Sequence, residues 1–319
     1  MTKSIEDLIN RQNARFYKLP LDKVKNRAGV GEVKALYQPH PTSQKAQNGQ
    51  LTIIGGSSLF HGAALLSLIT ASRIVDMVFF SGPKEDKALT SKLKSSLYSF
   101  IWIPESDLEH YIEKSDAILI GPGMMRYSKE LRNKGIKEAK NKIEINGEGK
   151  RTKRVTERLL TKFPQKQWII DAGSLQTMDK KFIPKVAILT PNRLEFQMLF
   201  GLAKTAENLK KMAKEFQCII INKAAEAGVY SGYNNDKNYN GYKSIGLPQP
   251  GLTKGGTGDV SAGLIAALTC KNDPFLAACA GTFLVKFTAK RLSEKMGNYY
   301  NADDLANALP ETIKWCLDF

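Results

Sequence analysis

The sequence predicts an α/β fold with three layers (αβα), in which helices cover both faces of a mostly parallel central sheet. Short, continuously apolar segments recur along the chain, and each ends in a glycine-rich or polar turn that leads into a helix-forming stretch. Uninterrupted apolar strands are typical of parallel sheets, because these are buried on both faces. Ligands of such sheets bind beyond the carboxyl ends of the strands. These turns are therefore where function is expected.

Six apolar segments are the predicted parallel strands. The first, residues 51–54, runs into Gly55-Gly56-Ser57 and then into a helix over residues 64–72, which makes the first half of a βαβ unit. The others are residues 77–80, 117–120, 168–170, 186–189 and 218–221. Residues 229–230 and 242–245 predict a β-hairpin around the polar turn 234–240. Further helices are expected over residues 5–16, 87–98, 274–291 and 303–315, the last with Asn301 as its N-cap.

The length and composition are those of one ordinary globular unit. The chain has 319 residues, of which 42% are hydrophobic and 24% charged. We expect an N-terminal arm over residues 1–48 and one domain over residues 49–319. Within the domain, residues 124–160 hold twelve Lys/Arg and five Asp/Glu, which predicts a solvated helical excursion.

The charge and cysteine content narrow the class of protein. The net charge is +16, which attracts phosphates and nucleotides. No nucleic-acid-binding motif accompanies it, so nucleic acid is not an expected partner. The four cysteines form no CxxC pair and predict neither a disulfide framework nor a zinc site. With no signal peptide and no apolar run long enough to span a bilayer, we expect a soluble, cytoplasmic protein with no membrane partner.

The stretch 251–268, GLTKGGTGDVSAGLIAAL, carries the strongest functional signal. Its glycines allow backbone N–H groups to approach a ligand, and the helix that follows adds free N–H donors and a partial positive charge. The loop therefore predicts a phosphate site. Asp259 either caps the helix or accepts a proton from a hydroxyl group while the loop amides hold a transferring phosphoryl group. We favour the second role.

Four other polar side chains follow predicted strands on the same rim. Lys223 either reaches a phosphate or begins a solvated loop. Asn192 and Glu195 would share a helix face, and Glu195 is equally a capping-box partner. Asp171 either holds a metal-bound water or caps the next helix, and capping is the slightly favoured role. No direct metal-ligand motif is present, although Glu195 could hold magnesium through water.

The succession IIGGSSLFHGA, ILIGPGM, IIDAGSL, ILTPNRLEF, INKA and GLTKGGTGDVSAG resembles the ADP/ATP-dependent NAD(P)H-hydrate dehydratase family of the ribokinase-like superfamily. The resemblance covers about residues 38–318. It implies a lyase that repairs hydrated NADH or NADPH by phosphorylating the C6 hydroxyl from ADP or ATP, with Mg²⁺, and then eliminating phosphate. It also implies a homo-oligomer. One unit plus an arm accounts for the 319 residues, so we expect no fused epimerase domain among them.

The resemblance assigns roles to individual residues. It implies contacts to the hydrated dinucleotide from Ala63, Gly123, Asn192 and Asp259, with Asp259 catalytic. The resemblance implies contacts to the adenine nucleotide from Lys223, Ala224, Ala225, Glu226, Ala227 and Gly258. The phosphate site predicted at the glycine loop adds Gly255, Gly256 and Thr257 to the expected nucleotide-binding residues. The chain departs from the family pattern at Pro41-Thr42, where Lys-Gly is usual, at Asn192, where His is usual, and at Ala224, where Gly is usual.

Two other functions are compatible with the same residues. A ribokinase-like kinase of a vitamin precursor or a sugar would release a stable phosphorylated product, and Asn before a nearby Glu is common in such kinases. An inactive nucleotide-binding or nucleic-acid-binding protein would use only the positive charge. The intact Asp259 argues against inactivity, and the lack of interleaved basic and aromatic residues argues against nucleic acid.

Overall fold

The protein is described by a computed structural model, which covers residues 4–57, 59–82, 97, 99–127, 140–233 and 241–319. Three helices precede the first strand: α1 (Ile5–Tyr17), α2 (Leu21–Val24) and α3 (Val30–Lys34). The strands that follow are β1 (Gln50–Ile54), β2 (Met77–Ser81), β3 (Ile101–Trp102), β4 (Ala117–Ile120), β5 (Gln167–Ile170), β6 (Ile188–Leu189), β7 (Ile219–Asn222), β8 (Ala227–Ser231) and β9 (Tyr242–Ile245). The α-helices between and after them are α4 (His61–Ala71), α6 (Leu108–Lys114), α8 (Lys140–Lys162), α9 (Ala172–Thr177), α10 (Arg193–Phe200), α11 (Ala206–Phe216), α12 (Thr257–Thr269), α13 (Pro274–Met296) and α14 (Ala302–Asp318), with 3₁₀ turns η2 (Glu105–Asp107), η3 (Lys180–Phe182) and η4 (Pro250–Thr253).

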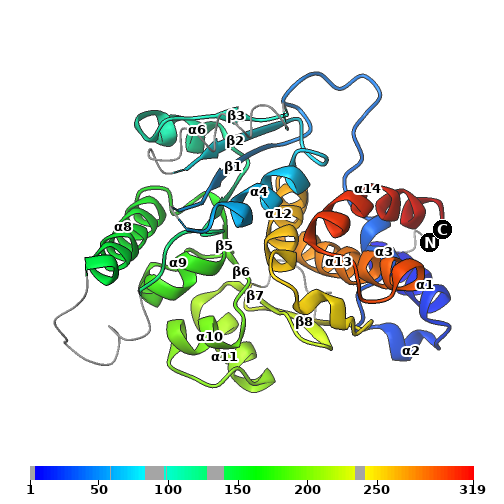
Figure 1. Cartoon of the computed structure of the whole chain (residues 1–319). Helices are drawn as coiled ribbons and strands as arrows, with labels where there is room; N and C mark the ends of the chain where they lie inside the picture. The colour runs from blue at the N-terminus through cyan, green and yellow to red at the C-terminus, as the bar shows by residue number, and fades with distance from the viewer. Residues whose placement is uncertain (1–3, 58, 83–96, 98, 128–139, 234–240) are drawn as a thin grey trace.

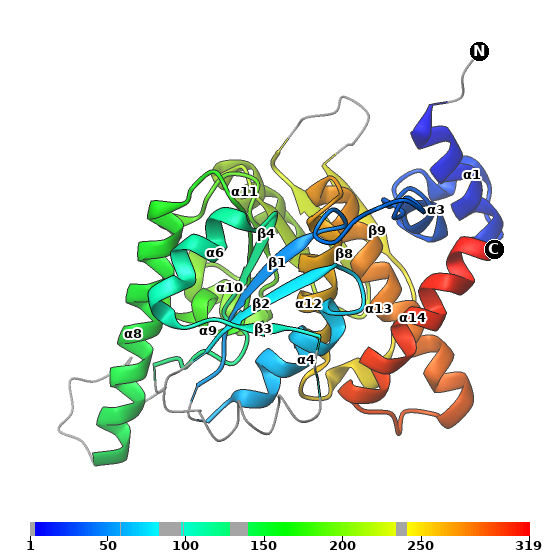
Figure 2. The same ribbon diagram turned by 90° about the horizontal axis from the view of Figure 1, so that it is seen from above.

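The strands form one nine-stranded sheet in the order β3-β2-β1-β4-β5-β6-β7-β8-β9. The pairs from β3 to β7 are parallel, and β8 and β9 add an antiparallel hairpin at one edge. Helices α4, α12, α13 and α14 lie on one face, and α6, α8, α9, α10 and α11 on the other (Figures 1 and 2). The predicted α/β fold with three layers is confirmed.

The apolar strands bury both of their faces, as a parallel sheet requires. Leu51 and Ile53 of β1 belong to the core that contains α12 and α13. Ile54 belongs to the core on the opposite face. Because side chains alternate along a strand, a continuously apolar β1 supplies both cores, and its end is fixed rigidly beneath the loop that follows it.

The N-terminal helices are held to the sheet by a buried polar network. Lys243 of β9 donates to Oε1 of Glu32 at 2.7 Å, and both side chains are almost fully buried. The other carboxylate oxygen of Glu32 accepts from Nδ2 of Asn13 at 2.9 Å and from the amide of Gly29 at 2.7 Å. The network ties α1 and α3 to the β9 edge and leaves no oxygen of this buried carboxylate unpaired.

Several elements differ from the sequence-based expectation. The strand predicted over residues 186–189 is only two residues long, because Val186 has a positive φ of 64°. The elements β3, α6 and α11 were not predicted, and α13 continues five residues beyond 291. The basic excursion contains the helix α8, as expected. Residues 128–139, the hairpin turn 234–240 and most of the predicted helix 87–98 lie outside the described residues. No described helix is both long and apolar enough to cross a membrane.

Candidate active site

The glycine loop before α12 is held in one conformation by its own contacts. Gly256, the N-cap of α12, has φ of 90°, and a Cβ there would lie 2.5 Å from Cδ1 of Leu66. Only glycine therefore fits. The hydroxyl of Thr257 donates to the carbonyls of Leu252 at 2.8 Å and Lys254 at 2.9 Å. The amide of Thr257 donates to the carbonyl of Lys254 at 3.4 Å. Because Gly256 has no side chain to accept from the next amide of α12, the N–H group of Gly258 remains for an anion.

Asp259 lies in the first turn of α12 and is half-buried. Its pKa is raised to about 7, chiefly by burial and then by the nearby charges of Asp171 and Glu195, while Lys223 opposes the shift. A carboxylate with a pKa close to neutrality can both accept and return a proton at physiological pH. Such a pKa is what a general base requires, and the catalytic role of Asp259 stays a prediction.

Asp171 and Lys223 form an ion pair beneath this carboxylate. Nζ of Lys223 lies 3.2 Å from Oδ1 of Asp171, whose side chain is only 4% exposed. The hydroxyl of Thr190 donates to the same oxygen. Burial alone would lower the pKa of Lys223, but Asp171 and Glu195 outweigh it and the pKa is raised. Lys223 is thus a fixed cation, not a solvated lysine.

The favoured capping role of Asp171 is wrong. Asp171 does occupy the N-cap position of α9, yet its side chain makes no capping hydrogen bond to that helix. The carboxylate turns to Lys223 and Thr190 instead, because a charge-assisted bond to a buried ammonium is stronger than a bond to a backbone amide. Asp171 therefore orients Lys223 and adds negative charge near Asp259.

Asn192 and Glu195 form a capping box at the start of α10. Oδ1 of Asn192 accepts from the amide of Glu195 at 2.9 Å, and Oε2 of Glu195 accepts from the amide of Asn192 at 2.8 Å. Oε1 of Glu195 accepts from Gln176 at 3.1 Å. Burial, then Asp171, raises the pKa of Glu195. The capping alternative is confirmed, and Glu195 also belongs to the acidic group around Lys223.

The described residues fit a magnesium ion only in company with phosphates. No described group of three or more His, Cys, Asp or Glu residues could hold a metal ion. Mg²⁺ typically keeps several waters and binds one or two carboxylates plus substrate phosphates. Both oxygens of Glu195 already accept hydrogen bonds, and its expected contact to magnesium through water stays a prediction.

A cavity of about 360 Å³ opens beside Lys223, between the glycine loop and α13. Six of the residues expected to contact the nucleotide line it: Lys223, Ala224, Ala225, Ala227, Thr257 and Gly258. Gly255, Gly256 and Glu226 do not. A Cβ at Gly258 would lie 3.7 Å from Nζ of Lys223, so the loop and the cation adjoin. The end of the cavity nearest the Asp171–Lys223 pair is therefore suited to phosphate.

Lys286 of α13 also lines this cavity and was not predicted. Its side chain crosses the cavity wall, donating to the carbonyls of Ala225 and, at 3.1 Å, Leu247. Burial lowers its pKa to about 8. A lysine inside an otherwise apolar helical segment, 274–289, was the sequence signal that could have found it.

Ala63 and Gly123, two of the four residues expected to contact the dinucleotide, lie across Asp171 from the nucleotide cavity, whereas Asn192 follows β6, on the same side of Asp171 as Lys223. A Cβ at Gly123 would lie 3.3 Å from Cβ of Ala63 and 3.2 Å from Cα of Gly56, so the loops after β1 and β4 meet the first turn of α4 there. A Cβ at Gly121 would lie 1.8 Å from the carbonyl oxygen of Asp171, which joins this corner to the acidic group. The structure thus brings Ala63 and Gly123 together, along the same rim as Asp259.

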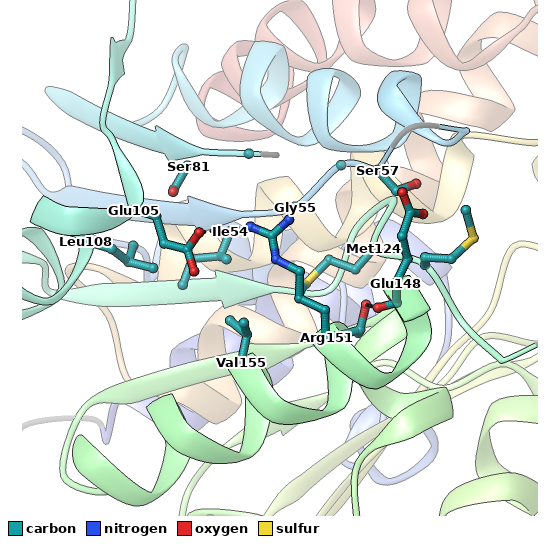
Figure 3. Close-up of a pocket in the computed structure, with 14 residues that line it drawn as sticks. Ile54, Gly55, Ser57, Ser81, Glu105, Leu108, Met124, Glu148, Arg151 and Val155 are labelled. Atoms are coloured by element: carbon teal, nitrogen blue, oxygen red, sulfur yellow. Dashed lines mark hydrogen bonds and ion pairs between the residues drawn. The ribbon is translucent and has the colours of Figure 1, made fainter. Parts of the chain in front are cut away.

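A second cavity begins at that corner and is called here the β1 slot. It lies between the loop after β1 and the helix α8, and Figure 3 shows its lining. Gly56, Ser57 and Met124 form one part of the wall, and Glu105, Glu148 and Arg151 supply its charged groups. None of these three charged residues was predicted. The basic excursion was assigned to solvent as a whole, and only the fold places one of its faces against the rim.

Comparison with known protein sequences gives the family of this chain. The family model described as NAD(P)H-hydrate dehydratase matches residues 51–311. The bifunctional NAD(P)H-hydrate repair enzyme of Methanocaldococcus jannaschii is 30% identical over 314 residues, covering 96% of this chain and 56% of that protein. The ADP-dependent (S)-NAD(P)H-hydrate dehydratase of Nitrosopumilus maritimus is 30% identical, covering 85% of this chain and 91% of that one.

Solved structures share the fold. The ADP/ATP-dependent NAD(P)H-hydrate dehydratase of Bacillus subtilis, co-crystallised with ATP and Mg²⁺, superimposes with a TM-score of 0.68 at 22% identity, covering 91% of this chain and 99% of that one. A ribokinase-like superfamily protein of Enterococcus faecalis gives 0.70 at 17% identity, covering 91% and 96%. The chain spans about half the length of the bifunctional relatives it matches. Because the family model covers most of the chain and a matched sequence relative is covered nearly from end to end, the chain belongs to the NAD(P)H-hydrate dehydratase family.

Proposed function

We propose that this protein dehydrates hydrated NADH or NADPH with an adenine nucleotide as phosphoryl donor. The observation that carries the proposal is the carboxyl of Asp259, with a pKa of about 7, beside both the glycine loop and the Asp171–Lys223 pair. The nucleotide cavity lies on one side of this group and the corner formed by Ala63 and Gly123 on the other. This arrangement supports a position of Asp259 between the phosphoryl donor and the acceptor hydroxyl.

In the first step, Asp259 takes the proton of the C6 hydroxyl as that oxygen attacks the terminal phosphorus of the nucleotide. The phosphorus–oxygen bond to the leaving phosphate breaks, and the shortened nucleotide carries away its electron pair. The amides at the start of α12 and the ammonium of Lys223 hold the negative charge of the transferring group. When bound with the nucleotide, Mg²⁺ supplies further charge neutralisation at the phosphates.

In the second step, the C6–oxygen bond breaks and phosphate leaves with its electrons. The lone pair of the ring nitrogen assists this departure. The adjacent C5 then loses a proton to water, and the electrons of its C–H bond form the C5–C6 double bond that restores the dihydronicotinamide. Phosphorylation matters because hydroxide is a poor leaving group.

The proposal is tested by incubating the protein with NADH hydrate or NADPH hydrate, Mg²⁺, and either ADP or ATP. Recovery of the reduced-nicotinamide absorbance together with stoichiometric release of phosphate is the expected result. A ribokinase-like kinase would instead consume the nucleotide with a sugar or vitamin precursor and accumulate a stable phosphate ester. Nucleotide-independent or absent recovery with both hydrates would contradict the proposal. Comparing initial rates with ADP and ATP identifies the donor.

We further propose that the protein works as a homo-oligomer in the cytoplasm, and that residues 1–48 act as an arm on a single domain, 49–319. The buried Glu32–Lys243 pair supports the arm, since it fixes α3 to β9. Light scattering tests the assembly: a mass of only about 35 kDa, that of one chain, at working concentration would contradict it.

A further inference from the structure

The β1 slot lies where the distal part of a dinucleotide would fall, an inference that rests on the proposed function. In the proposed reaction the hydrated ring must reach Asp259, which lies near Asp171 at the end of β5. The nucleotide cavity occupies the sheet edge beside Lys223, which follows β7. The slot adjoins the ends of β1 and β2, which are two and three strands from β5 on the opposite side. At about 4.8 Å per strand, this is roughly 10–14 Å. The adenosine half of the substrate therefore extends toward the slot.

Three charged side chains decide what the slot can hold. Arg151 of α8 lies between Glu105 and Glu148 in Figure 3 and is the single basic side chain among the described residues that line the slot. Nη2 of Arg151 donates to Oε2 of Glu105 at 2.8 Å, so its charge is already matched. Two carboxylates and one guanidinium give the lining a net charge of −1, which opposes an additional phosphate.

One carboxylate oxygen of Glu148 lacks a hydrogen-bond donor among the described residues. This oxygen, Oε2, is buried. A buried, unpaired carboxylate oxygen is costly unless a ligand supplies the donor. The neighbouring hydroxyls of a ribose are such donors, and a carboxylate that binds the ribose 2′-hydroxyl is how many dinucleotide sites accept NAD, whereas a nearby arginine accommodates the 2′-phosphate of NADP.

We propose that the β1 slot binds the adenosine ribose of the hydrated dinucleotide through Glu148, and that the enzyme therefore prefers NADH hydrate to NADPH hydrate. Glu148 accepts from the ribose hydroxyls and repels a 2′-phosphate. Glu105 acts with it by holding Arg151, which would otherwise be free to pair with that phosphate. The specificity arises from Glu148 and Arg151 of the basic excursion and from Glu105 of η2, none of which the phosphoryl chemistry itself uses.

The test compares Glu148→Gln and Glu105→Gln with the wild-type protein. For each, kcat/KM is measured with NADH hydrate and NADPH hydrate at a fixed saturating nucleotide. We expect the wild type to favour NADH hydrate and each variant to shift the ratio toward NADPH hydrate by about tenfold or more, because removal of one close charge changes binding by this order. Glu113→Gln on α6, which removes an exposed charge and does not line the slot, is the matched control and should leave the ratio unchanged.

Binding of the products gives a second, turnover-independent measurement. Titration with NADH and NADPH should show the same change in the ratio of dissociation constants. A wild type that prefers NADPH hydrate, or a ratio within twofold of the wild type in either variant, overturns the proposal. Failure of the proposed function is distinguishable, because then neither hydrate is turned over by the wild-type protein at all.

Discussion

The rate of dehydration should follow the ionisation of Asp259, and a pH–rate profile tests this. Burial, together with Asp171 and Glu195, raises the pKa of Asp259 to about 7. Only the ionised carboxylate can accept the hydroxyl proton, so activity is present above this pKa and lost below it. The ionised fraction is about nine-tenths at pH 8 and about one-tenth at pH 6, and kcat/KM should fall about tenfold between them.

A variant at Asp171 distinguishes ionisation of Asp259 from ionisation of a nucleotide phosphate as the cause of the pH dependence. The charge of Asp171 raises the pKa of Asp259, so Asp171→Asn should move the acid limb of the profile to lower pH. A nucleotide phosphate also titrates near pH 6, but its limb would not move in the variant. The assay is initial-rate recovery of nicotinamide absorbance between pH 5 and 9. A profile that is flat from pH 6 to 8, or a limb that stays in place in Asp171→Asn, would refute the reasoning.

Three further predictions concern the cavity, the arm and the stability of the site. Lys286→Met leaves two carbonyls of the nucleotide cavity unpaired, so the nucleotide KM should rise about tenfold with kcat nearly unchanged. The control Lys290→Met, one helical turn further along α13, should change neither KM nor kcat. Lys243→Met breaks a buried ion pair and leaves the carboxylate of Glu32 buried without its cationic partner. Urea denaturation should therefore show a decrease of about 3 kcal/mol in the free energy of unfolding. The pKa of Asp259 is about 7 in the folded protein and 3.8 in the unfolded chain, so the free energy of unfolding decreases as pH rises between these values. Asp259→Asn should therefore be more stable than the wild type at pH 8, by at most about 4 kcal/mol, with little difference at pH 4.

The fold was predictable because its strands are continuously apolar and each ends in a distinctive turn. The segments 51–54, 77–80, 117–120 and 168–170 all appear as parallel strands in one sheet. The two-residue strand β3 has too few residues to show a pattern. The shortening of β6 depends on the positive φ of Val186, a non-glycine conformation that a sequence does not reveal.

The site was predictable where its residues are contiguous in sequence and was missed where they come from distant parts of the chain. Asp259 and its glycine loop are contiguous in sequence and were found directly. The pairing of Asp171 with Lys223 spans 52 positions, and a local rule favoured a cap where a long-range ion pair forms. Lys286, Glu105 and Glu148 come from elements whose local patterns indicate only packing or solvation. Lys286 and Glu148 lie near the rim because α13 and α8 pack over the sheet, and Glu105 lies there because η2 follows the end of β3.

The most direct test of the central claim is Asp259→Asn, measured for turnover and for nucleotide binding in the same preparation. The amide keeps the size and hydrogen-bonding capacity of the side chain but cannot accept the hydroxyl proton. We predict that kcat for hydrate dehydration falls by about 10²–10⁴, the range typical of a general base, while the nucleotide dissociation constant changes by less than about threefold. Turnover within tenfold of the wild type would contradict the account and leave Asp259 without a role as the catalytic base.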